Sequence, residues 1–431
     1  MQAHEQLDQF FGEFFRLMSQ ADPSTYNAFL NRAEAEFRRL GYREEIPAGV
    51  ENILIVRLDV IGDMILTSGF IREVRRNFPQ ARITLVVSPL VYPIVELCPY
   101  VNEILIFNER FFNSHFNGKN FFILLEKLAI FCRENLWWKH FSIAFSPQWG
   151  TDNLAGLLIC WLSGARERVG YGTNPYESWI GKPAPEESEL DNFLLTRNIV
   201  TPKSAVAEIE KNFYLLEAVG LEVNQMHTEL WFGEADILQA CELLKGIPST
   251  CKKILLGIGA GDARRRYPVE KYLIALKELV KKNLVFVIVG GKSELEDAKF
   301  IEQNLPRGKV LNLVGKTTLR ETEAIISQMD FYLGNDSGVT HMAAAAQIPC
   351  IVLYREAVDK EDFLPGFVSE VGRFPPWQTN AVILRPDYQL EDCANKPPTY
   401  GWCHVHDRPH CITQITPQEI IAGFYQLATS F

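Results

Sequence analysis

The sequence predicts an α/β protein in which two doubly wound domains follow a helical extension. Apolar side chains of residues 1–41 recur at three- and four-residue spacing, which is typical of helices. Strand-like runs alternate with helical segments from about residue 51, and the alternation restarts near residue 253. Such alternation produces parallel sheets, and 431 residues are enough for two or three domains. We expect the extension at 1–46, one Rossmann-like domain at 47–235, a second at 236–415 and a C-terminal helix at 416–431.

Two helices are expected in the extension. Asp22-Pro23-Ser24 ends the first helix and starts the second, and Gly41 is suited to cap the second. The apolar stripes of both helices are rich in phenylalanine. Because apolar helix faces are mostly buried in a core, we expect these stripes to pack on the main body. The alternative is a contact with a second copy of the chain or with another partner.

Each domain has its own series of strands. The first domain is expected to hold strands at 52–58, 82–87, 103–107 and 141–145. The second is expected to hold strands at 253–258, 284–291, 310–313, 330–333 and 349–353, with helices at 268–282, 293–304 and 338–346. Open parallel sheets bind ligands at the carboxyl ends of their strands, so the two domains are expected to face a cleft.

Composition argues against several classes of protein. A net charge of −10 and a pI near 5.5 argue against a nucleic-acid partner held by bulk charge. No basic stretch precedes an apolar one at the start, and no apolar run approaches the roughly 18–20 residues of a membrane span. The cysteines before residue 390 are scattered without a pairing pattern, as buried thiols in a reducing compartment are. We expect a cytoplasmic protein, with peripheral contact at the inner membrane as the alternative.

The first candidate site is the turn after the first strand. Gly62 permits a tight turn, and Asp63 stands at the end of the strand and the start of a helix. An aspartate there can cap the helix, or it can act as a general base that takes a proton from a hydroxyl nucleophile. Asp59 is a nearby competitor for the role of base.

The second candidate site is segment 259–268, which follows the first strand of the second domain. Its small residues let the backbone approach a ligand, and Arg264, Arg265 and Arg266 offer fork-shaped donors to a phosphate. A solvated basic turn is the alternative. A run of arginines at a strand end in an otherwise acidic protein favours the phosphate site.

The third candidate site is segment 333–346, which reads as a strand, a polar turn and a helix of small residues. The backbone amides of Ser337, Gly338 and Val339 at the start of this helix can bind an anion. His341 lies in the first turn and faces either the ligand or the core.

At these three places the sequence resembles glycosyltransferase family 9, the ADP-heptose:lipopolysaccharide heptosyltransferases and their relatives. The resemblance runs from about Glu51 to the C-terminus. The motifs that carry it are R-L-D-V-I-G-D-M-I-L-T at 57–67, W-L-S-G-A-R-E-R-V-G at 161–170, R-R-Y-P-V-E-K-Y at 265–272, V-G-G-K at 289–292, G-N-D-S-G-V-T-H-M-A-A-A at 334–345 and C-I-T-Q-I-T-P-Q-E-I at 411–420.

The resemblance implies a GT-B fold, in which the first domain binds the acceptor and the second binds the nucleotide sugar ADP-heptose. It implies an inverting transfer without a required cofactor. Asp63 matches the proposed general base of the family. Arg265 stands in register with a family lysine and would bind the departing phosphates, with Arg264 and Arg266 as alternatives. The amides at 337–339 would stabilise the same growing negative charge.

The other site residues follow from the same resemblance. Asp336 would hold sugar hydroxyls or cap the helix, Lys292 or Glu294 would meet the ribose, and Thr317 would line the adenine pocket. The implied donor-binding set is Gly259, Arg265, Lys292, Glu294, Thr317, Asp336, Ser337, Gly338, Val339 and His341. The implied acceptor-binding set is Arg57, Arg166 and Arg168, for which simple ion pairs are the alternative.

The acceptor is expected to be a lipid-linked saccharide, namely a lipopolysaccharide core sugar. A protein hydroxyl is one alternative. Another is a non-catalytic nucleotide-sugar-binding partner on the same fold, which the helical extension and the arginine in place of a lysine would suit.

Two segments depart from the family pattern. Residues 107–149 are unusually aromatic, which indicates either a filled core or a surface for lipid or acceptor. The loop before the last helix holds Cys393, Cys403, His404 and Cys411 in the pattern C-x9-C-H-x-H-x3-H-C. Thiols and neutral imidazoles suit zinc or iron, so a structural metal is one interpretation, and reduced thiols or a disulfide are the others.

Overall fold

The computed structural model describes residues 52–108, 118–149, 154–172, 194–200, 205–358, 369–394, 405 and 407–428. The predicted helical extension lies outside these residues, so its helices and its contacts with the main body, a second copy or a membrane stay predictions. The 109–117 part of the aromatic segment also lies outside them. The exact domain boundaries likewise stay predictions.

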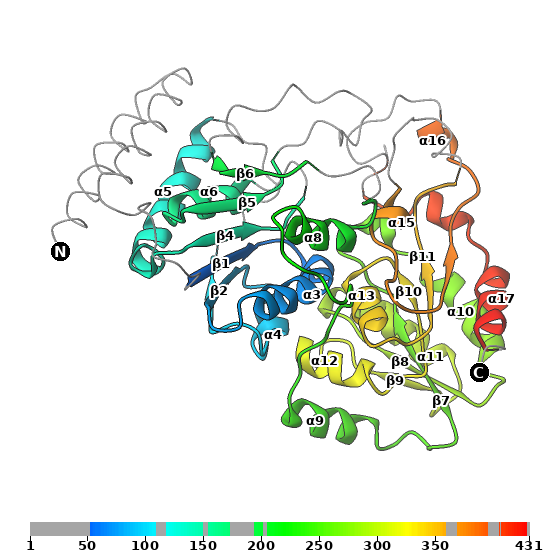
Figure 1. The fold of residues 1–431 in the computed structure, drawn as a ribbon. Coiled ribbons are helices and arrows are strands. Elements are labelled where there is room, and N and C mark those ends of the chain that lie inside the picture. The colour runs from blue at the N-terminus through cyan, green and yellow to red at the C-terminus, as the bar shows by residue number, and fades with distance from the viewer. Residues whose placement is uncertain are drawn as a thin grey trace.

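The first domain is built on a parallel six-stranded sheet with strand order β3-β2-β1-β4-β5-β6 (Figure 1). Its strands are β1 Asn52–Arg57, β2 Arg82–Val87, β3 Glu103–Ile106, β4 Ile143–Ser146, β5 Glu167–Gly170 and β6 Arg197–Asn198. Its helices are α3 Ile61–Asn77, α4 Tyr92–Val95, α5 Gly118–Asn135, η2 Trp137–Lys139, α6 Leu154–Leu162 and α8 Glu208–Glu217. The four expected strands are confirmed, and β5 and β6 are additional.

The second domain repeats this design in strand order β9-β8-β7-β10-β11-β12. Its strands are β7 Lys252–Gly257, β8 Leu284–Ile288, β9 Val310–Asn312, β10 Phe331–Asn335, β11 Cys350–Leu353 and β12 Ala381–Leu384. Its helices are α9 Glu234–Leu244, η4 Ala263–Arg265, α10 Val269–Leu279, η5 Lys292–Glu294, α11 Leu295–Asn304, α12 Leu319–Ile326, α13 Gly338–Ala345, α15 Glu370–Arg373, α16 Glu391–Ala394, η6 Cys411–Gln414 and α17 Pro417–Ala428. The five expected strands are confirmed, and β12 is additional.

Both sheets reverse their strand order at one point, between β1 and β4 in the first domain and between β7 and β10 in the second. Doubly wound folds bind ligands outside the carboxyl ends of the strands at such a point. Asp63 follows β1, Arg265 follows β7 and Asp336 follows β10. The topology alone therefore brings the three candidate sites to the switch points of the two sheets.

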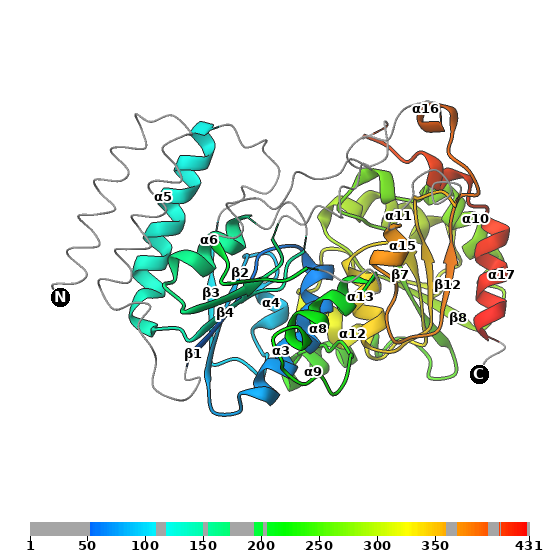
Figure 2. The same ribbon diagram turned by 45° about the horizontal axis from the view of Figure 1, so that its top comes forward.

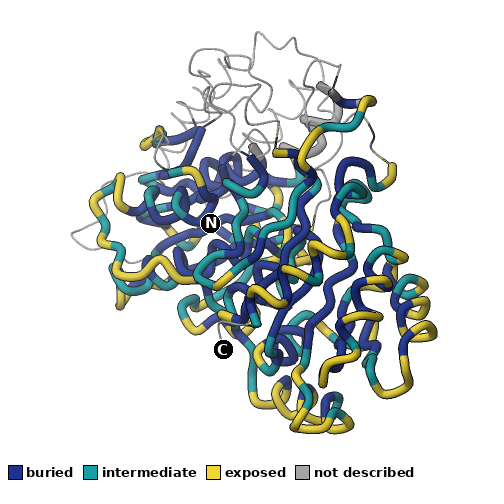
Figure 3. Tube along the Cα trace, turned by 90° about the vertical axis from the view of Figure 1, so that its right-hand side faces the viewer, coloured by how far each residue is buried: buried dark blue, intermediate teal, exposed yellow. Residues whose placement is uncertain are grey.

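Helices cover both faces of each sheet, which explains the apolar strands. In β1 the four residues Ile53, Leu54, Ile55 and Val56 are fully buried, as is usual for parallel strands. Buried segments run through the middle of the molecule and exposed ones lie toward its outside (Figure 3). In both ribbon views α3, α8 and α13 lie together where the two domains meet (Figures 1 and 2).

The described part of the aromatic segment is mainly core. Trp137, Phe141, Phe145 and Trp149 are buried, whereas Trp138 is 49% exposed. The indole N–H of Trp137 donates to the carbonyl oxygen of Leu162, which satisfies its one polar group. Among the described helices, none is long and apolar enough to cross a membrane.

Candidate active site

The starts of α3 and α13 pack closely, and in each of two contacts a side chain of one helix lies against a glycine of the other. A Cβ atom on Gly338 would lie 2.7 Å from Cγ2 of Ile61, and one on Gly62 would lie 2.7 Å from Cδ2 of His341. Both distances are far shorter than a carbon–carbon contact, so a larger residue at either position would force the neighbouring side chain to shift. The turn before Asp63 and the turn before α13 therefore face each other where the two domains meet.

Asp63 is the third residue of α3, and its side chain is 15% exposed. The N-cap of the helix is Val60, which makes no side-chain capping bond. Capping by Asp63 is thus not what begins this helix. Its carboxylate instead accepts from Nη2 of Arg57 at 3.3 Å. This contact fixes the carboxylate while leaving part of it open.

Arg57 is buried at the carboxyl end of β1 and is surrounded by carboxylates. Its guanidinium lies 2.8 Å from Asp59, 3.3 Å from Asp63 and 3.1 Å from Glu208. Burial alone would lower the pKa of Arg57, but the three carboxylates raise it above its ordinary value. With its side chain 1% exposed, Arg57 orients Asp63 and has no surface for an acceptor, which corrects the expected role.

The same network crosses into the second domain through Glu208. This carboxylate is completely buried on α8 and also pairs with Nε of Arg373 on α15 at 3.0 Å. Burial opposes its ionisation, yet Arg373 and Arg57 lower the pKa of Glu208 below its usual value. Arg373 also donates to the carbonyl oxygen of Trp149 at 2.9 Å. A buried Arg–Glu–Arg chain therefore joins the two domains beside Asp63.

The three arginines after β7 take three different directions. Arg264 folds back on Asp262, whose carboxylate is 2.6 Å away, and Arg266 pairs with Glu294 at 3.2 Å. Arg265 alone pairs with Asp336, at 3.1 Å between Nη1 and Oδ2. The charge of Asp336 and, more weakly, that of Asp63 raise the pKa of Arg265 above its ordinary value. The charges of both aspartates thus act on Arg265.

Asp336 is almost completely buried between β10 and α13. Burial raises the pKa of Asp336 to about 6, although Arg265 opposes the rise. The neighbouring residue Ser337 is the N-cap of α13, and it makes no side-chain capping bond. The first N–H groups of a helix have no acceptor within the helix, so this turn presents donors next to Arg265.

His341 is buried in the first turn of α13, and its Nδ1 has no hydrogen-bond partner among the described residues. Burial and the charge of Arg265 lower the pKa of His341 to about 4. The imidazole is therefore neutral near pH 7. Its ring packs against Gly62 and, edge-on, against Phe374.

The remaining expected donor residues divide into two groups. Glu294 is buried against Gly259, where a Cβ atom would lie 2.7 Å from the Glu294 carboxyl carbon. Lys292 is exposed, and the hydroxyl of Thr317 shares a hydrogen bond with Thr322 at 2.9 Å. Of the two ribose candidates, Glu294 thus lies against the arginine loop and Lys292 lies at the surface.

Two expected acceptor contacts are in the wrong place. Arg166 immediately precedes β5 and Arg168 is its second residue, so both belong to the amino-terminal edge of the sheet, opposite Asp63. Arg168 is buried and donates to the carbonyl oxygens of Leu194 and Ala165. The expected acceptor contacts of Arg166 and Arg168 are therefore wrong. The motif specifies the residue types, whereas the direction of β5 determines at which edge of the sheet the two side chains lie.

The sequence analysis does not name Glu208, Arg373 and Glu370, but the structure places all three beside the candidate site. Glu370 pairs with Arg355 and lies 3.8 Å from Arg265. These residues sit in short or ordinary helical segments, and no spacing in the sequence distinguishes them from surface charges. Of the expected metal ligands, Cys393 and Cys411 are described below, and Cys403 and His404 lie outside the described residues.

Two doubly wound parallel sheets with their switch points brought together form the GT-B fold, which the solved structures of glycosyltransferases share. The chain belongs to glycosyltransferase family 9. The protein-family model described as "Glycosyltransferase family 9 (heptosyltransferase)" matches residues 178–403, which is slightly more than half of the chain.

Known proteins agree with this membership. Lipopolysaccharide heptosyltransferase 3 of Escherichia coli is 22% identical over 295 residues, which cover 68% of this chain and 80% of that protein. Lipopolysaccharide heptosyltransferase 1 of Campylobacter coli is 28% identical over 107 residues, 24% of this chain and 31% of that protein.

Solved structures show the same fold. A family 9 glycosyl transferase from Veillonella parvula superposes with a TM-score of 0.67 at 17% identity, covering 90% of this chain and 99% of that one. The ADP-heptose lipopolysaccharide heptosyltransferase II of E. coli gives a TM-score of 0.62 at 19% identity, covering 88% and 99%.

Proposed function

We propose that the protein transfers a heptose from ADP-heptose to a hydroxyl of a lipopolysaccharide core sugar, with inversion at the anomeric carbon. The observation that carries this proposal is the meeting of Asp63, Arg265 and Asp336 at the switch points of two facing sheets. The relatives are named lipopolysaccharide heptosyltransferases, which supports the choice of sugar and acceptor. The cytoplasmic location stays a prediction.

In this reaction the Asp63 carboxylate accepts the proton of the acceptor hydroxyl. The hydroxyl oxygen then forms a bond to the anomeric carbon, on the face opposite the diphosphate, and the bond between that carbon and the phosphate oxygen breaks. ADP leaves with the electron pair of the broken bond. Arg57 donates to the Asp63 carboxylate and orients it.

The second domain stabilises the negative charge that develops on the departing diphosphate. Arg265 and the first amides of α13 are the donors that meet it, and fixed donors in a partly buried site cost little reorganisation. Asp336 pairs with Arg265, so a diphosphate at Arg265 competes with this carboxylate for the guanidinium. The neutral imidazole of His341 adds no charge to the site.

The decisive experiment compares Asp63→Asn with Asp59→Asn, because both carboxylates pair with Arg57 and only one is proposed as base. We expect Asp63→Asn to bind ADP-heptose normally and to lose transfer to a purified core acceptor, measured by ADP release. Asp59→Asn is expected to retain most turnover. Near-normal turnover of Asp63→Asn would falsify the role of this residue as base.

Donor and acceptor are tested separately. Thermal stabilisation by ADP-heptose and ADP, but not by UDP or GDP sugars, supports the donor, since a ligand that binds only the folded state raises apparent stability. Opposite anomeric configurations in donor and product, read by NMR, support inversion. Stabilisation by ADP-heptose without turnover on saccharide or protein acceptors would instead indicate a non-catalytic binding partner.

A further inference from the structure

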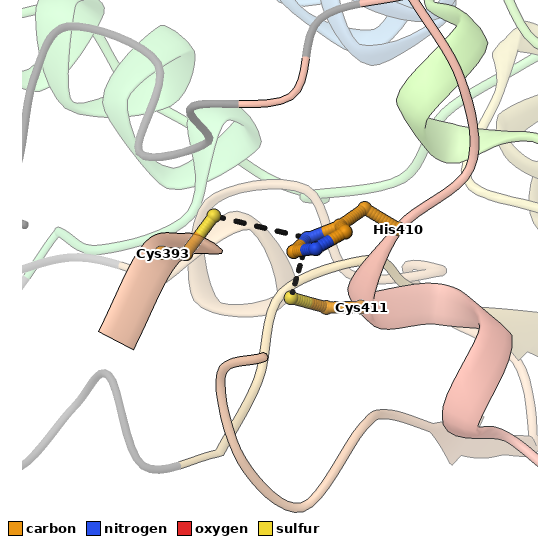
Figure 4. Close-up of side chains that lie close together, drawn as sticks. All are labelled: Cys393, His410 and Cys411. Atoms are coloured by element: carbon orange, nitrogen blue, oxygen red, sulfur yellow. Dashed lines mark hydrogen bonds between the residues drawn. The ribbon is translucent and has the colours of Figure 1, made fainter. Parts of the chain in front are cut away.

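A buried cluster of two cysteines and one histidine lies in the second domain, outside the proposed active site. Cys393 comes from α16, His410 is the residue before η6, and Cys411 is the first residue of η6. All three residues are at least nine-tenths buried. In Figure 4 the two sulfur atoms lie on either side of the same edge of the His410 ring.

The distances in this cluster are those of a coordination sphere. Nδ1 of His410 lies 3.8 Å from Sγ of Cys393 and 3.4 Å from Sγ of Cys411, and the three ligand atoms all lie within 4.8 Å of one another. Zinc bonded tetrahedrally to sulfur at about 2.3 Å and nitrogen at about 2.0–2.1 Å separates those two ligands by about 3.6 Å. The observed sulfur–nitrogen distances bracket this value.

Both thiols approach one and the same nitrogen of His410. A neutral imidazole nitrogen that does not carry a proton has one lone pair and accepts one good hydrogen bond, whereas two thiols here approach the same Nδ1. Protonating that nitrogen reverses the roles without removing the competition. A metal ion placed among the three atoms satisfies all of them at once.

We propose that Cys393, His410 and Cys411 bind a thiolate-preferring transition metal, Zn²⁺ or Fe²⁺, as a structural site. On binding, the two thiols lose their protons to solvent and the imidazole coordinates through Nδ1, so the ion gains two thiolates and one neutral nitrogen. This ligand set suits zinc and iron and does not suit magnesium or calcium, which prefer oxygen.

The cluster includes the start of η6, and residues in and just after η6 contact the segment that follows the three arginines. Thr413, two residues beyond Cys411, offers its carbonyl oxygen to Nζ of Lys271 on α10. The hydroxyl of Tyr267 donates to the carbonyl oxygen of Ile415 at 2.7 Å, and the amide of Tyr267 donates to Asn335 at 3.2 Å. Since Tyr267 follows the three arginines, a metal at η6 would brace the loop that presents Arg265.

The test uses the full chain purified under reducing conditions without chelators, with metals measured by inductively coupled plasma mass spectrometry. We expect about one zinc or iron per chain. Cys393→Ser and Cys411→Ser are expected to lose most of this metal, and Cys251→Ser, a half-buried cysteine elsewhere in the same domain, to keep it. Full metal content in either of the first two variants overturns the proposal.

A second measurement does not depend on the variants folding. Wild-type protein is stripped of metal and titrated with Co²⁺, whose thiolate charge-transfer bands report sulfur ligands. X-ray absorption of the native metal is expected to show two sulfur neighbours at about 2.3 Å. A shell of oxygen and nitrogen only, or metal-free protein that takes up neither Zn²⁺ nor Co²⁺, contradicts the site. Loss of metal with unchanged donor binding would leave the proposed function intact.

Discussion

Asp63 and Asp336 are the same residue type, and each follows a strand that flanks the switch point of its sheet, yet their surroundings differ. Asp63 is 15% exposed and shares Arg57 with two other carboxylates. Asp336 is 3% exposed and pairs with Arg265, and burial raises its pKa to about 6. The two switch points thus hold a partly exposed carboxylate in one domain and a desolvated one in the other.

The largest expected effect separates the two aspartates by kinetics. Asp63→Asn is expected to lower kcat by about 10²–10⁴-fold with little change in donor affinity, because only proton transfer is lost. Asp336→Asn is expected to alter donor affinity more than kcat, because it changes the partner of Arg265. Steady-state kinetics and calorimetric titration with ADP check both. If both variants changed kcat and donor affinity in the same way, the two aspartates would not have different roles.

The buried charge chain that supports Asp63 gives the next largest effect. Glu208→Gln leaves Arg57 and Arg373 buried without their shared carboxylate, and breaking such a pair costs about 3–5 kcal/mol in free energy of unfolding. Glu217→Gln, on an exposed position of the same helix, is the matched control and should change stability by less than about 0.5 kcal/mol. Denaturant unfolding measures both. Equal free energies of unfolding for the two variants would show that the buried Arg–Glu–Arg pairs do not stabilise the fold.

A smaller effect is expected at the seam between α3 and α13. Gly338→Ala places a methyl group against Ile61 and is expected to cost about 1–3 kcal/mol. Gly246→Ala, which meets open space, is the control. The double variant Ile61→Ala with Gly338→Ala should recover part of the loss, since it makes room for the methyl group. Additive losses in thermal unfolding would argue against a direct contact.

The smallest effect is the pH dependence of donor binding. A diphosphate beside Asp336 raises the pKa of this carboxyl further, so binding takes up a proton and affinity rises as pH falls through about 6. Between about pH 7.5 and about pH 5.5 we expect a few-fold gain in ADP affinity, which Asp336→Asn should flatten. Arg265 and Arg355 oppose this rise in pKa, whereas Glu370 and Asp63 support it. Calorimetry across this range is the measurement, and an unchanged slope in the variant would exclude Asp336.

The core of the site could be predicted from the sequence because apolar strands ending in polar turns carry a strong local signal. Asp63, Arg265 and Asp336 each follow such a strand. The network around Glu208 could not be predicted, since its partners come from β1 and α15 and meet only after the domains pack. Strand β6 could not be predicted either, because two residues are too few to show any period.

Arg166 and Arg168 show a different limit. A motif such as W-L-S-G-A-R-E-R-V-G carries residue types but not the direction of the strand that they join. Arg168 donates to backbone carbonyl oxygens at the amino-terminal edge, so its place in the motif does not indicate contact with an acceptor. Register within the sheet decides this, and register comes from pairing with β4.

The glycine contacts between α3 and α13 also restrict how the two domains can move. With Ile61 packed on Gly338 and His341 packed on Gly62, each of these contacts sets a side chain directly against backbone. Sliding one domain along the other would drive backbone into side chain, whereas rotation about the seam keeps both contacts. We therefore expect the seam to act as a pivot, so that the cleft widens away from it while the distance between Asp63 and the start of α13 stays nearly constant.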